Sequence, residues 1–386
     1  MLAIIAPGQG SQSPGMLSAW LKDSTLRDTC AAWSLEIGID LLTLGTSADA
    51  EEIKDTANAQ PLIVAAGLLS FKALGVTPSV VSGHSVGEIT AASLATIISE
   101  TDAMRIVTAR GFEMAKAAAI TPAGMSAVLG GEREAVVAAI TAAGLVAANE
   151  NGGGQIVAAG SLDALEKLAA NPPEGARVRA LAVAGAFHTS YMQPAIEPLR
   201  ALVAATHTHD PVAAIISNKE GAQVSTGREF MDRIVSQIAN PVRWDLCMST
   251  LKSMGVTGVI ELAPAGTLVG LLKRAEPSIE TFALKSPDDL DAAQIFAGKH
   301  GAYPKLRRRE TVAFRPRDLD GTPHAIRSDG RPRARPGTAG NGVDDGRFAA
   351  AQYTALAALC RRLQAVLPLR EVAAHSDIAP GRKSDP

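Results

Sequence analysis

The pentapeptide Gly-His-Ser-Val-Gly at residues 83–87 contains residue types that could perform nucleophilic catalysis. A serine hydroxyl is a poor nucleophile until a base removes its proton. In a Gly-x-Ser-x-Gly turn between a buried strand and a helix, the glycines permit a tight bend and the serine is exposed at its tip. The sequence therefore predicts Ser85 as a candidate nucleophile. The plainer alternative is that Ser85 only caps the helix that follows.

The base for Ser85 must be sought among seven histidines. Consecutive residues in such a turn point apart, so we expect His84 to pack or hydrogen-bond rather than to deprotonate Ser85. His188 follows the last strand of an inserted unit and should project where that unit meets the main domain. This position makes it the candidate base, although a lone histidine is more often structural. The other histidines lie in a polar stretch (His207, His209) or at the basic C-terminal end (His300, His324, His375).

A catalytic histidine also needs an acceptor for its second ring nitrogen. Composition and spacing do not identify the group that would supply it.

The elements that would position these residues alternate between short apolar runs and helical patterns, which is typical of an α/β domain with a parallel sheet. The sequence predicts strands at 2–6, 79–81, 213–217 and 256–262, and helices at 26–37, 58–74, 86–99, 101–119 and 229–239. We therefore expect a large α/β-hydrolase-like domain that comprises residues 1–123 and 185–301.

A different rhythm interrupts this domain at residues 124–184. Strand patterns at 125–130, 145–149, 155–160 and 176–183 and helical patterns at 132–144 and 161–171 follow the order β-α-β-β-α-β. That order predicts an inserted ferredoxin-like subdomain. A ligand cleft is expected where the two units meet.

Composition excludes several classes of protein. Hydrophobic residues make up 47% of 386 residues, which is enough for a sizeable core, and no run of 18 or more apolar residues predicts a membrane span. The first residues lack a basic segment and a long apolar segment, so no signal peptide is predicted. Cys30, Cys247 and Cys360 are scattered without metal-binding spacing. We expect a reduced, cytoplasmic protein without a bound metal, not associated with membranes.

Charge divides the chain near Gly301. Lys plus Arg outnumber Asp plus Glu by 16 to 9 after that residue, whereas the acidic residues lead by 30 to 21 before it. Residues 302–346 are rich in Arg, Pro and Gly and lack a sustained apolar period, which predicts a disordered basic linker. Basic segments can bind nucleic acid, but a solvated linker is the simpler interpretation, and no nucleic-acid partner is expected.

Several motifs occur in an order that carries a family resemblance. They are "PGQGSQ" at 7–12, "QPLI" at 60–63, "GHSVGE" at 83–88, "RG" at 110–111, "NENGGGQIVAAG" at 149–160, "GAFH" at 185–188 and "NPVRW" at 240–244. Together they resemble the malonyl-CoA:acyl carrier protein transacylases of type II fatty acid synthesis over residues 1–299. The resemblance implies an acyltransferase that acts on malonyl-CoA and an acyl carrier protein and uses no cofactor.

The resemblance also implies roles for the reacting residues. Ser85 would carry the malonyl ester and His188 would be its base. The backbone carbonyl of Gln237 would orient His188, so no carboxylate is required as a third member. The backbone N–H groups of Gln9 and Val86 would form the oxyanion hole, where each pre-aimed donor is worth roughly 3 to 4 kcal/mol.

Two further residues would set the choice of substrate. Arg110 would bind the free carboxylate of the malonyl group, for which the planar guanidinium is suited. Without the resemblance, Arg110 would be interpreted as an exposed helix arginine. Phe187 resembles the malonyl-preferring pattern, in which a bulky ring crowds an α-methyl group.

Two other functions share part of this sequence pattern. A serine hydrolase or thioesterase would share the serine turn, but its acid normally precedes the histidine and its oxyanion loop lies between early strands. A dinucleotide-binding module would need glycine at the position of Ser13, and no acidic residue follows at the required distance.

The last forty residues carry a second, partial resemblance. An amphipathic helical pattern followed by "HSDIAPGRKSDP" is similar to the C-terminal end of zinc-dependent N-acetylmuramoyl-L-alanine amidases. On that match His375 and Asp385 would be zinc ligands and Lys383 a catalytic-site lysine. The sheet and first histidine ligand of that family have no counterpart here, and a catalytic zinc needs three protein ligands. We therefore expect residues 347–386 to be an orphan, inactive fragment.

Overall fold

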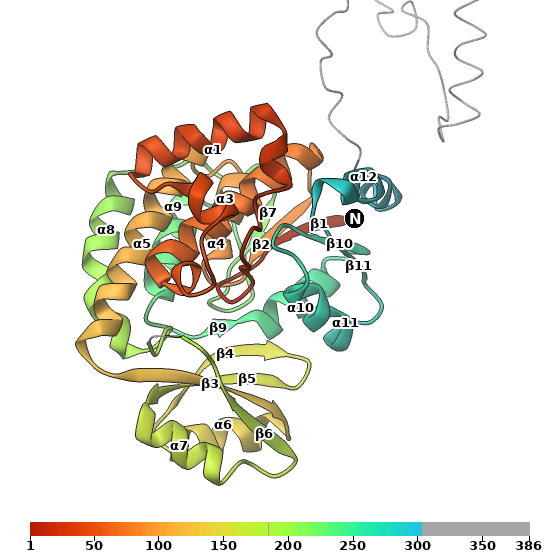
Figure 1. Ribbon diagram of the computed structural model, residues 1–386. Helices are drawn as coiled ribbons and strands as arrows, with labels where there is room; N and C mark the ends of the chain where they lie inside the picture. The colour runs from red at the N-terminus through yellow and green to blue at the C-terminus, as the bar shows by residue number, and fades with distance from the viewer. Residues whose placement is uncertain (184, 303–386) are drawn as a thin grey trace, which may run out of the picture. The chain divides into compact units, whose positions relative to one another are not determined.

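The computed structural model describes residues 1–183 and 185–302 of the chain (Figure 1). The predicted linker after Ala302 and the amidase-like fragment, including His324, His375, Lys383 and Asp385, lie outside the described residues.

A six-stranded sheet forms the centre of the main domain, in the order β11-β10-β1-β2-β7-β8. The first five of these strands are parallel and β8 pairs antiparallel with β7. Every residue of β1 is buried, as expected for a strand covered on both faces. The bounds are β1 (Leu2–Ala6), β2 (Val80–Gly83), β7 (Ala214–Ile216), β8 (Gln223–Val224), β10 (Gly258–Glu261) and β11 (Glu280–Ala283). The predicted α/β class with a parallel sheet is confirmed.

Helices accompany this sheet along the chain. They are α1 (Ser24–Ile37), α2 (Leu41–Thr46), α3 (Thr56–Leu74), α4 (Gly87–Leu94), α5 (Glu100–Ile120), α8 (Ile196–Ala205), α9 (Gly227–Gln237), α10 (Trp244–Ser253), α11 (Thr267–Ala275) and α12 (Leu290–Lys299). The described residues also form four short 3-10 helices, η1 (Trp20–Lys22), η2 (Glu52–Lys54), η3 (Ser190–Ala195) and η4 (Pro287–Asp289). Helices α2, α8, α10, α11 and α12 were not predicted from the sequence.

The helix predicted at 86–99 is wrong at its C-terminal end. Helix α4 stops at Leu94, and Thr96 adopts a φ of 60° that no α-helix can contain. Ser99 then caps α5, because its side chain accepts a hydrogen bond from the backbone N–H of Asp102. The result is a short helix after Ser85 that is packed between longer ones.

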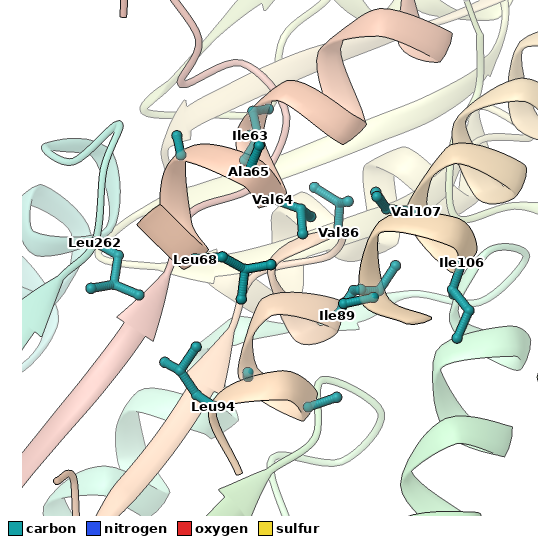
Figure 2. Packing of buried hydrophobic residues seen from close by; sticks show 14 of the residues in the cluster. Ile63, Val64, Ala65, Leu68, Val86, Ile89, Leu94, Ile106, Val107 and Leu262 are labelled. Atoms are coloured by element: carbon teal, nitrogen blue, oxygen red, sulfur yellow. The ribbon is translucent and has the colours of Figure 1, made fainter. Parts of the chain in front are cut away.

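Helix α3 is the central core helix of the main domain. Figure 2 shows part of the apolar cluster that α3 forms with α4 and α5; its members include Ile63, Val64, Leu68, Val86, Ile89, Leu94, Ile106 and Val107. Among the described helices, α3 alone is long and apolar enough to cross a membrane, but 78% of its apolar window is buried inside the fold. Its hydropathy is therefore that of a core helix, and this core fixes the position of α4.

The unit between Ala123 and Ala180 follows the predicted order of elements and has its own apolar core. Its elements are β3 (Ala123–Gly130), α6 (Arg133–Ala142), β4 (Val146–Gly152), β5 (Gln155–Ser161), α7 (Leu162–Ala170) and β6 (Ala176–Ala180). The sheet order is β6-β3-β5-β4-β9, and its fifth strand, β9 (Val242–Arg243), comes from the main domain and runs parallel to β4. This shared strand ties the two units together next to the segment that follows α9.

The described residues next to the predicted break at Gly301 are buried. His300 is 6% exposed rather than part of a basic tail: its Nδ1 lies 2.9 Å from Thr257 Oγ1 and its ring packs on Phe296. Ala302 is also buried in the apolar core. The folded part therefore continues through residue 302.

Candidate active site

Ser85 sits in a strained turn between β2 and α4. Its φ of 53° lies in the left-handed region, which residues other than glycine rarely adopt. A Cβ on Gly83 would overlap the backbone of Gly87, and a Cβ on Gly87 would overlap the backbone carbonyl of Ala6. Only glycine therefore fits at either position, and the turn presents Ser85 at its tip.

His188 is the base partner that the fold brings to Ser85. Ser85 Oγ lies 2.8 Å from His188 Nε2, although the two residues are 103 positions apart. His188 Nδ1 lies 2.8 Å from the backbone carbonyl oxygen of Gln237. Because a carbonyl can only accept, Nδ1 carries the proton and Nε2 is free to accept one from Ser85. The arrangement is a serine–histidine pair oriented by a backbone carbonyl.

His84 points to different partners. Its Nε2 lies 2.8 Å from Asn151 Oδ1, and its ring packs edge-on against Trp244. Burial lowers the pKa of His84 below its ordinary value. These contacts match the packing and hydrogen-bonding role predicted for this residue.

Arg110 lies beside the serine, at 1% exposure, and is not the exposed helix arginine of the plain interpretation. Its NH1 donates to Gln60 Oε1 at 2.6 Å, and its NH2 donates to Gln237 Oε1 at 2.9 Å and to Ser85 Oγ at 3.3 Å. Its Nε is buried and has no hydrogen-bond partner in the described part of the chain. Burial lowers the pKa of Arg110 to about 10, with Glu88 acting in the opposite direction, so the guanidinium stays charged at neutral pH.

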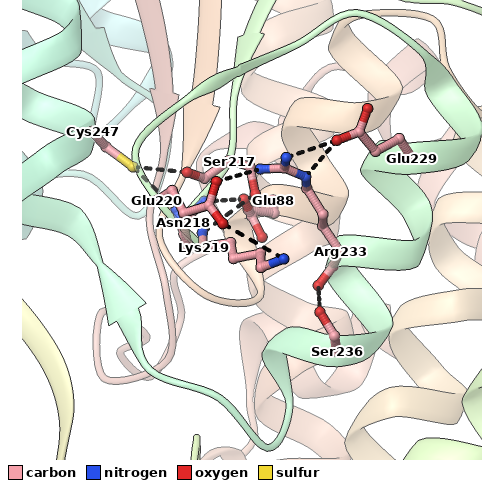
Figure 3. Close-up of polar contacts among 9 residues, drawn as sticks. All are labelled: Glu88, Ser217, Asn218, Lys219, Glu220, Glu229, Arg233, Ser236 and Cys247. Atoms are coloured by element: carbon pink, nitrogen blue, oxygen red, sulfur yellow. Dashed lines mark hydrogen bonds and ion pairs between the residues drawn. The ribbon is translucent and has the colours of Figure 1, made fainter.

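A buried polar network lies behind the turn and was not predicted from the sequence. Glu88 accepts hydrogen bonds from the backbone N–H of Asn218 at 2.6 Å and from Gln237 Nε2. Asn218 Oδ1 accepts from the backbone N–H of Ser85 at 2.7 Å, and its Nδ2 donates to the carbonyl of Gly83 at 2.7 Å. Figure 3 shows Glu88 and Asn218 close together, with Cys247 at one end of the contacts drawn, where its Sγ lies 3.6 Å from Asn218 Nδ2. The "GHSVGE" motif contains Glu88, but an acidic residue in the first turn of a helix is usually an exposed partner of the helix dipole.

A cavity of about 230 Å³ opens onto Ser85 and His188 and is lined by both units. Gln9 and Phe187 from the main domain and Asn151 and Gln155 from the inserted unit are among its lining residues. The backbone N–H groups of Gln9 and Val86 donate to no acceptor within residues 1–302, so they are available to a ligand. Arg110 and Gln237 are not among the residues that line this cavity, but both hydrogen-bond to Ser85. A larger hollow of about 750 Å³, lined by Val146, Asn240 and Arg243 among others, contains neither Ser85 nor His188.

The electrostatics of His188 give a prediction for stability. Burial, with the nearby charge of Arg110, lowers the pKa of His188 from 6.5 to about 3. Below pH 6.5 the His188 side chain is protonated in the unfolded chain, whereas in the folded protein it stays neutral down to about pH 3. The free energy of unfolding should therefore fall with decreasing pH by up to about 1.4 kcal/mol per pH unit from this group. Urea unfolding of wild type and His188→Gln between pH 7 and pH 5 measures the difference.

The variant should show the shallower dependence on pH. His84 contributes in the same direction in both proteins and cancels from the comparison. Identical slopes would mean that His188 titrates normally in the folded protein, contrary to its burial.

Comparisons with known proteins identify the family of the chain. An acyl transferase domain model matches residues 4–293. The malonyl CoA-acyl carrier protein transacylase of Mycobacterium tuberculosis is 52% identical over 297 residues, which cover 75% of this chain and 98% of that protein. The protein of the same name from Escherichia coli strain K12 is 31% identical over 302 residues, with coverages of 75% and 98%.

Two solved structures are similar as well. The crystal structure of MCAT from Mycobacterium tuberculosis superposes with a TM-score of 0.74 at 51% identity, over 76% of this chain and 99% of that one. A type II PKS acyl-carrier protein in complex with its malonyl-transacylase gives a TM-score of 0.71 at 28% identity, with coverages of 76% and 98%. The chain therefore belongs to the acyl transferase family that includes the malonyl CoA-acyl carrier protein transacylases.

Proposed function

We propose that the protein transfers a malonyl group from coenzyme A to the phosphopantetheine thiol of an acyl carrier protein, through an ester on Ser85. The observation that carries this proposal is the 2.8 Å contact between Ser85 Oγ and His188 Nε2, with Nδ1 held by the Gln237 carbonyl. The Mycobacterium tuberculosis and Escherichia coli relatives are matched over 98% of their own length, and both are named malonyl CoA-acyl carrier protein transacylase. The reaction loads the carrier for fatty acid biosynthesis.

In the first half-reaction, His188 Nε2 takes the proton of Ser85 Oγ as that oxygen attacks the thioester carbonyl of malonyl-CoA. Negative charge develops on the carbonyl oxygen, where the free N–H groups of Gln9 and Val86 can donate to it. The carbon–sulfur bond then breaks. The CoA thiolate leaves with the proton that His188 held, and Ser85 carries the malonyl ester.

The second half-reaction reverses these steps with a different thiol. His188 Nε2 takes the proton of the carrier's phosphopantetheine thiol, and the sulfur attacks the ester on Ser85. Collapse of the intermediate expels Ser85 Oγ, which recovers its proton from His188. Burial keeps His188 neutral at pH 7, so it is ready to accept a proton in each half-reaction.

Arg110 supplies recognition of the malonyl carboxylate in this proposal. It is charged and in contact with Ser85 Oγ, and its buried Nε–H has no partner within the described residues. A buried donor without an acceptor is costly, and a substrate carboxylate would satisfy it. Phe187, which lines the cavity beside His188, would crowd an α-methyl group on the same acyl chain.

We also propose the domain organisation in its finer form. An α/β-hydrolase-like domain of residues 1–123 and 185–301 would hold Ser85 and His188, and a ferredoxin-like insertion of residues 124–184 would form the other wall of the cavity. The separate core of the insertion supports this division, whereas strand β9 links the units. A cytoplasmic location stays a prediction.

Malonyl loading tests the function directly. Incubation of the protein with malonyl-CoA should raise its intact mass by one malonyl group, and addition of holo acyl carrier protein should move that group to the carrier. Mass spectrometry of both proteins follows the two steps. The alternative is a thioesterase, which would release malonate into water without a thiol acceptor. Rapid loss of the ester in buffer alone would favour it over the transferase.

A further inference from the structure

Glu88 is a buried carboxyl group that the proposed chemistry does not use. It is 1% exposed and lies on α4, in the first turn after Ser85. Within residues 1–302 it forms no ion pair, and its hydrogen-bond partners are Asn218 and the side chain of Gln237. Burial raises the pKa of Glu88 to about 8, and a buried carboxyl group is costly unless it is hydrogen-bonded. A role for it must therefore come from what it holds in place.

The group that Glu88 holds is the side-chain amide of Gln237. Gln237 Nε2 faces three oxygens, namely a carboxyl oxygen of Glu88, the Ser85 carbonyl at 3.2 Å and Asn218 Oδ1 at 3.2 Å. The amide oxygen of Gln237 consequently faces the opposite way, where it accepts from Arg110 NH2 at 2.9 Å. A flipped amide would set its NH2 group against the guanidinium, donor against donor.

The Asn218 side chain cannot replace Glu88 in this task. Its amide is already fixed by two backbone groups, because Nδ2 donates to the Gly83 carbonyl and Oδ1 accepts from the Ser85 N–H. It therefore offers Gln237 only a shared acceptor at 3.2 Å. Glu88 offers Gln237 Nε2 a carboxyl oxygen of its own, because the Asn218 N–H donates to the other oxygen of that group.

We propose that Glu88 is a positioning residue for malonyl selectivity, which acts through the Gln237 amide to fix the Arg110 guanidinium beside Ser85. Gln60 holds the other terminal nitrogen of Arg110 at 2.6 Å, so two amides set the orientation of the cation. Loss of either would let the guanidinium rotate away from the acyl group. The inference rests on the proposed role of Arg110 in binding the malonyl carboxylate.

The substitution Glu88→Gln in the full-length chain tests it. Two groups donate to Glu88, the Asn218 N–H and Gln237 Nε2. A glutamine has only one side-chain oxygen to accept them, so its NH2 group would face the second donor and that contact would become repulsive. We expect kcat/KM for malonyl-CoA to fall about tenfold to a hundredfold and that for acetyl-CoA to fall less. The decisive quantity is the ratio of the two values. A variant that folds normally and keeps the wild-type ratio would overturn the proposal.

A double-mutant cycle separates positioning from general support of the fold. If Glu88 acts through Arg110, then Glu88→Gln should not change the malonyl-to-acetyl ratio further in an Arg110→Ala background. A purely structural role would instead give effects that multiply, and that result would overturn the proposal. If Arg110→Ala alone left the ratio unchanged, the proposed role of Arg110 would fail. If only Glu88→Gln left it unchanged, the positioning role would fail and the function would stand.

Two more variants distinguish a loss of positioning from a loss of folding. Gln237→Met keeps the backbone carbonyl on His188 but removes the amide from Arg110, so it should reproduce the drop in the ratio even if Glu88→Gln does not fold. An unchanged ratio in Gln237→Met would count against the proposal. The matched control is Glu261→Gln, a fully buried carboxyl that accepts from the backbone N–H groups of Gly266, Leu268 and Val269. It should lower the melting temperature without changing the ratio.

Discussion

Replacement of Ser85 by alanine is expected to abolish malonyl loading and to reduce transfer to the carrier by at least about 10³-fold. The hydroxyl is the only group at the tip of the turn within reach of His188 Nε2 among the described residues. Removal of a catalytic serine typically costs several orders of magnitude, because the remaining groups cannot form the covalent intermediate. Intact-mass spectrometry after incubation with malonyl-CoA measures loading, and a carrier-protein mass shift measures transfer.

The matched control for this experiment is Ser93→Ala. Ser93 lies on the same helix, α4, and is not among the residues that line the cavity. It should load one malonyl group as the wild type does. A stable malonyl adduct on Ser85→Ala would show that another residue is the nucleophile and that the contact between Ser85 and His188 has a different purpose.

Replacement of Arg110 by alanine should change the choice of acyl group more than it changes the fold. A hydrogen bond to a charged group is worth about 1.5 to 3 kcal/mol, which corresponds to roughly 10- to 150-fold in kcat/KM for malonyl-CoA. The loss can exceed that range, because the malonyl carboxylate would be buried without its partner. Acetyl-CoA carries no carboxylate, so its kcat/KM should stay equal or rise. Steady-state kinetics with both CoA esters give the two ratios.

The control for Arg110→Ala is Arg105→Ala on the same helix, α5. Arg105 is half exposed and pairs with Glu36 at 2.7 Å, so its loss should leave both kcat/KM values unchanged. Equal losses for malonyl and acetyl in Arg110→Ala would mean that this arginine only supports the fold. Its only role would then be to hydrogen-bond the buried amides of Gln60 and Gln237, and selectivity would have to come from another residue.

The amino-acid sequence by itself determined the features that depend on neighbouring residues. The glycines at 83 and 87 predict the turn, because only a residue without Cβ fits against the crossing backbone. Buried apolar runs predict the parallel strands, and the order of elements in the insertion follows from local periodicity. The seven motifs in order indicated the family, which the comparisons confirm.

The tertiary structure decided which distant groups meet. Positive φ values at both Ser85 and His188 aim the two side chains at one another, and no local pattern encodes that geometry. The orienting carbonyl of Gln237 was implied only by the family resemblance, since every residue has a carbonyl and spacing cannot single one out. The same holds for strand β9, two residues long, which joins a sheet built mainly by another segment.

Glu88 shows most clearly why the rest could not be predicted. In the sequence it is an acidic residue in the first turn of a helix, which is an ordinary exposed position. In the fold, α4 is so short and so enclosed that this turn is buried, and Glu88 meets Asn218 and Gln237 from segments 130 and 149 residues away. Burial depends on how helices pack against one another, so it cannot be predicted from the residue type at a single position.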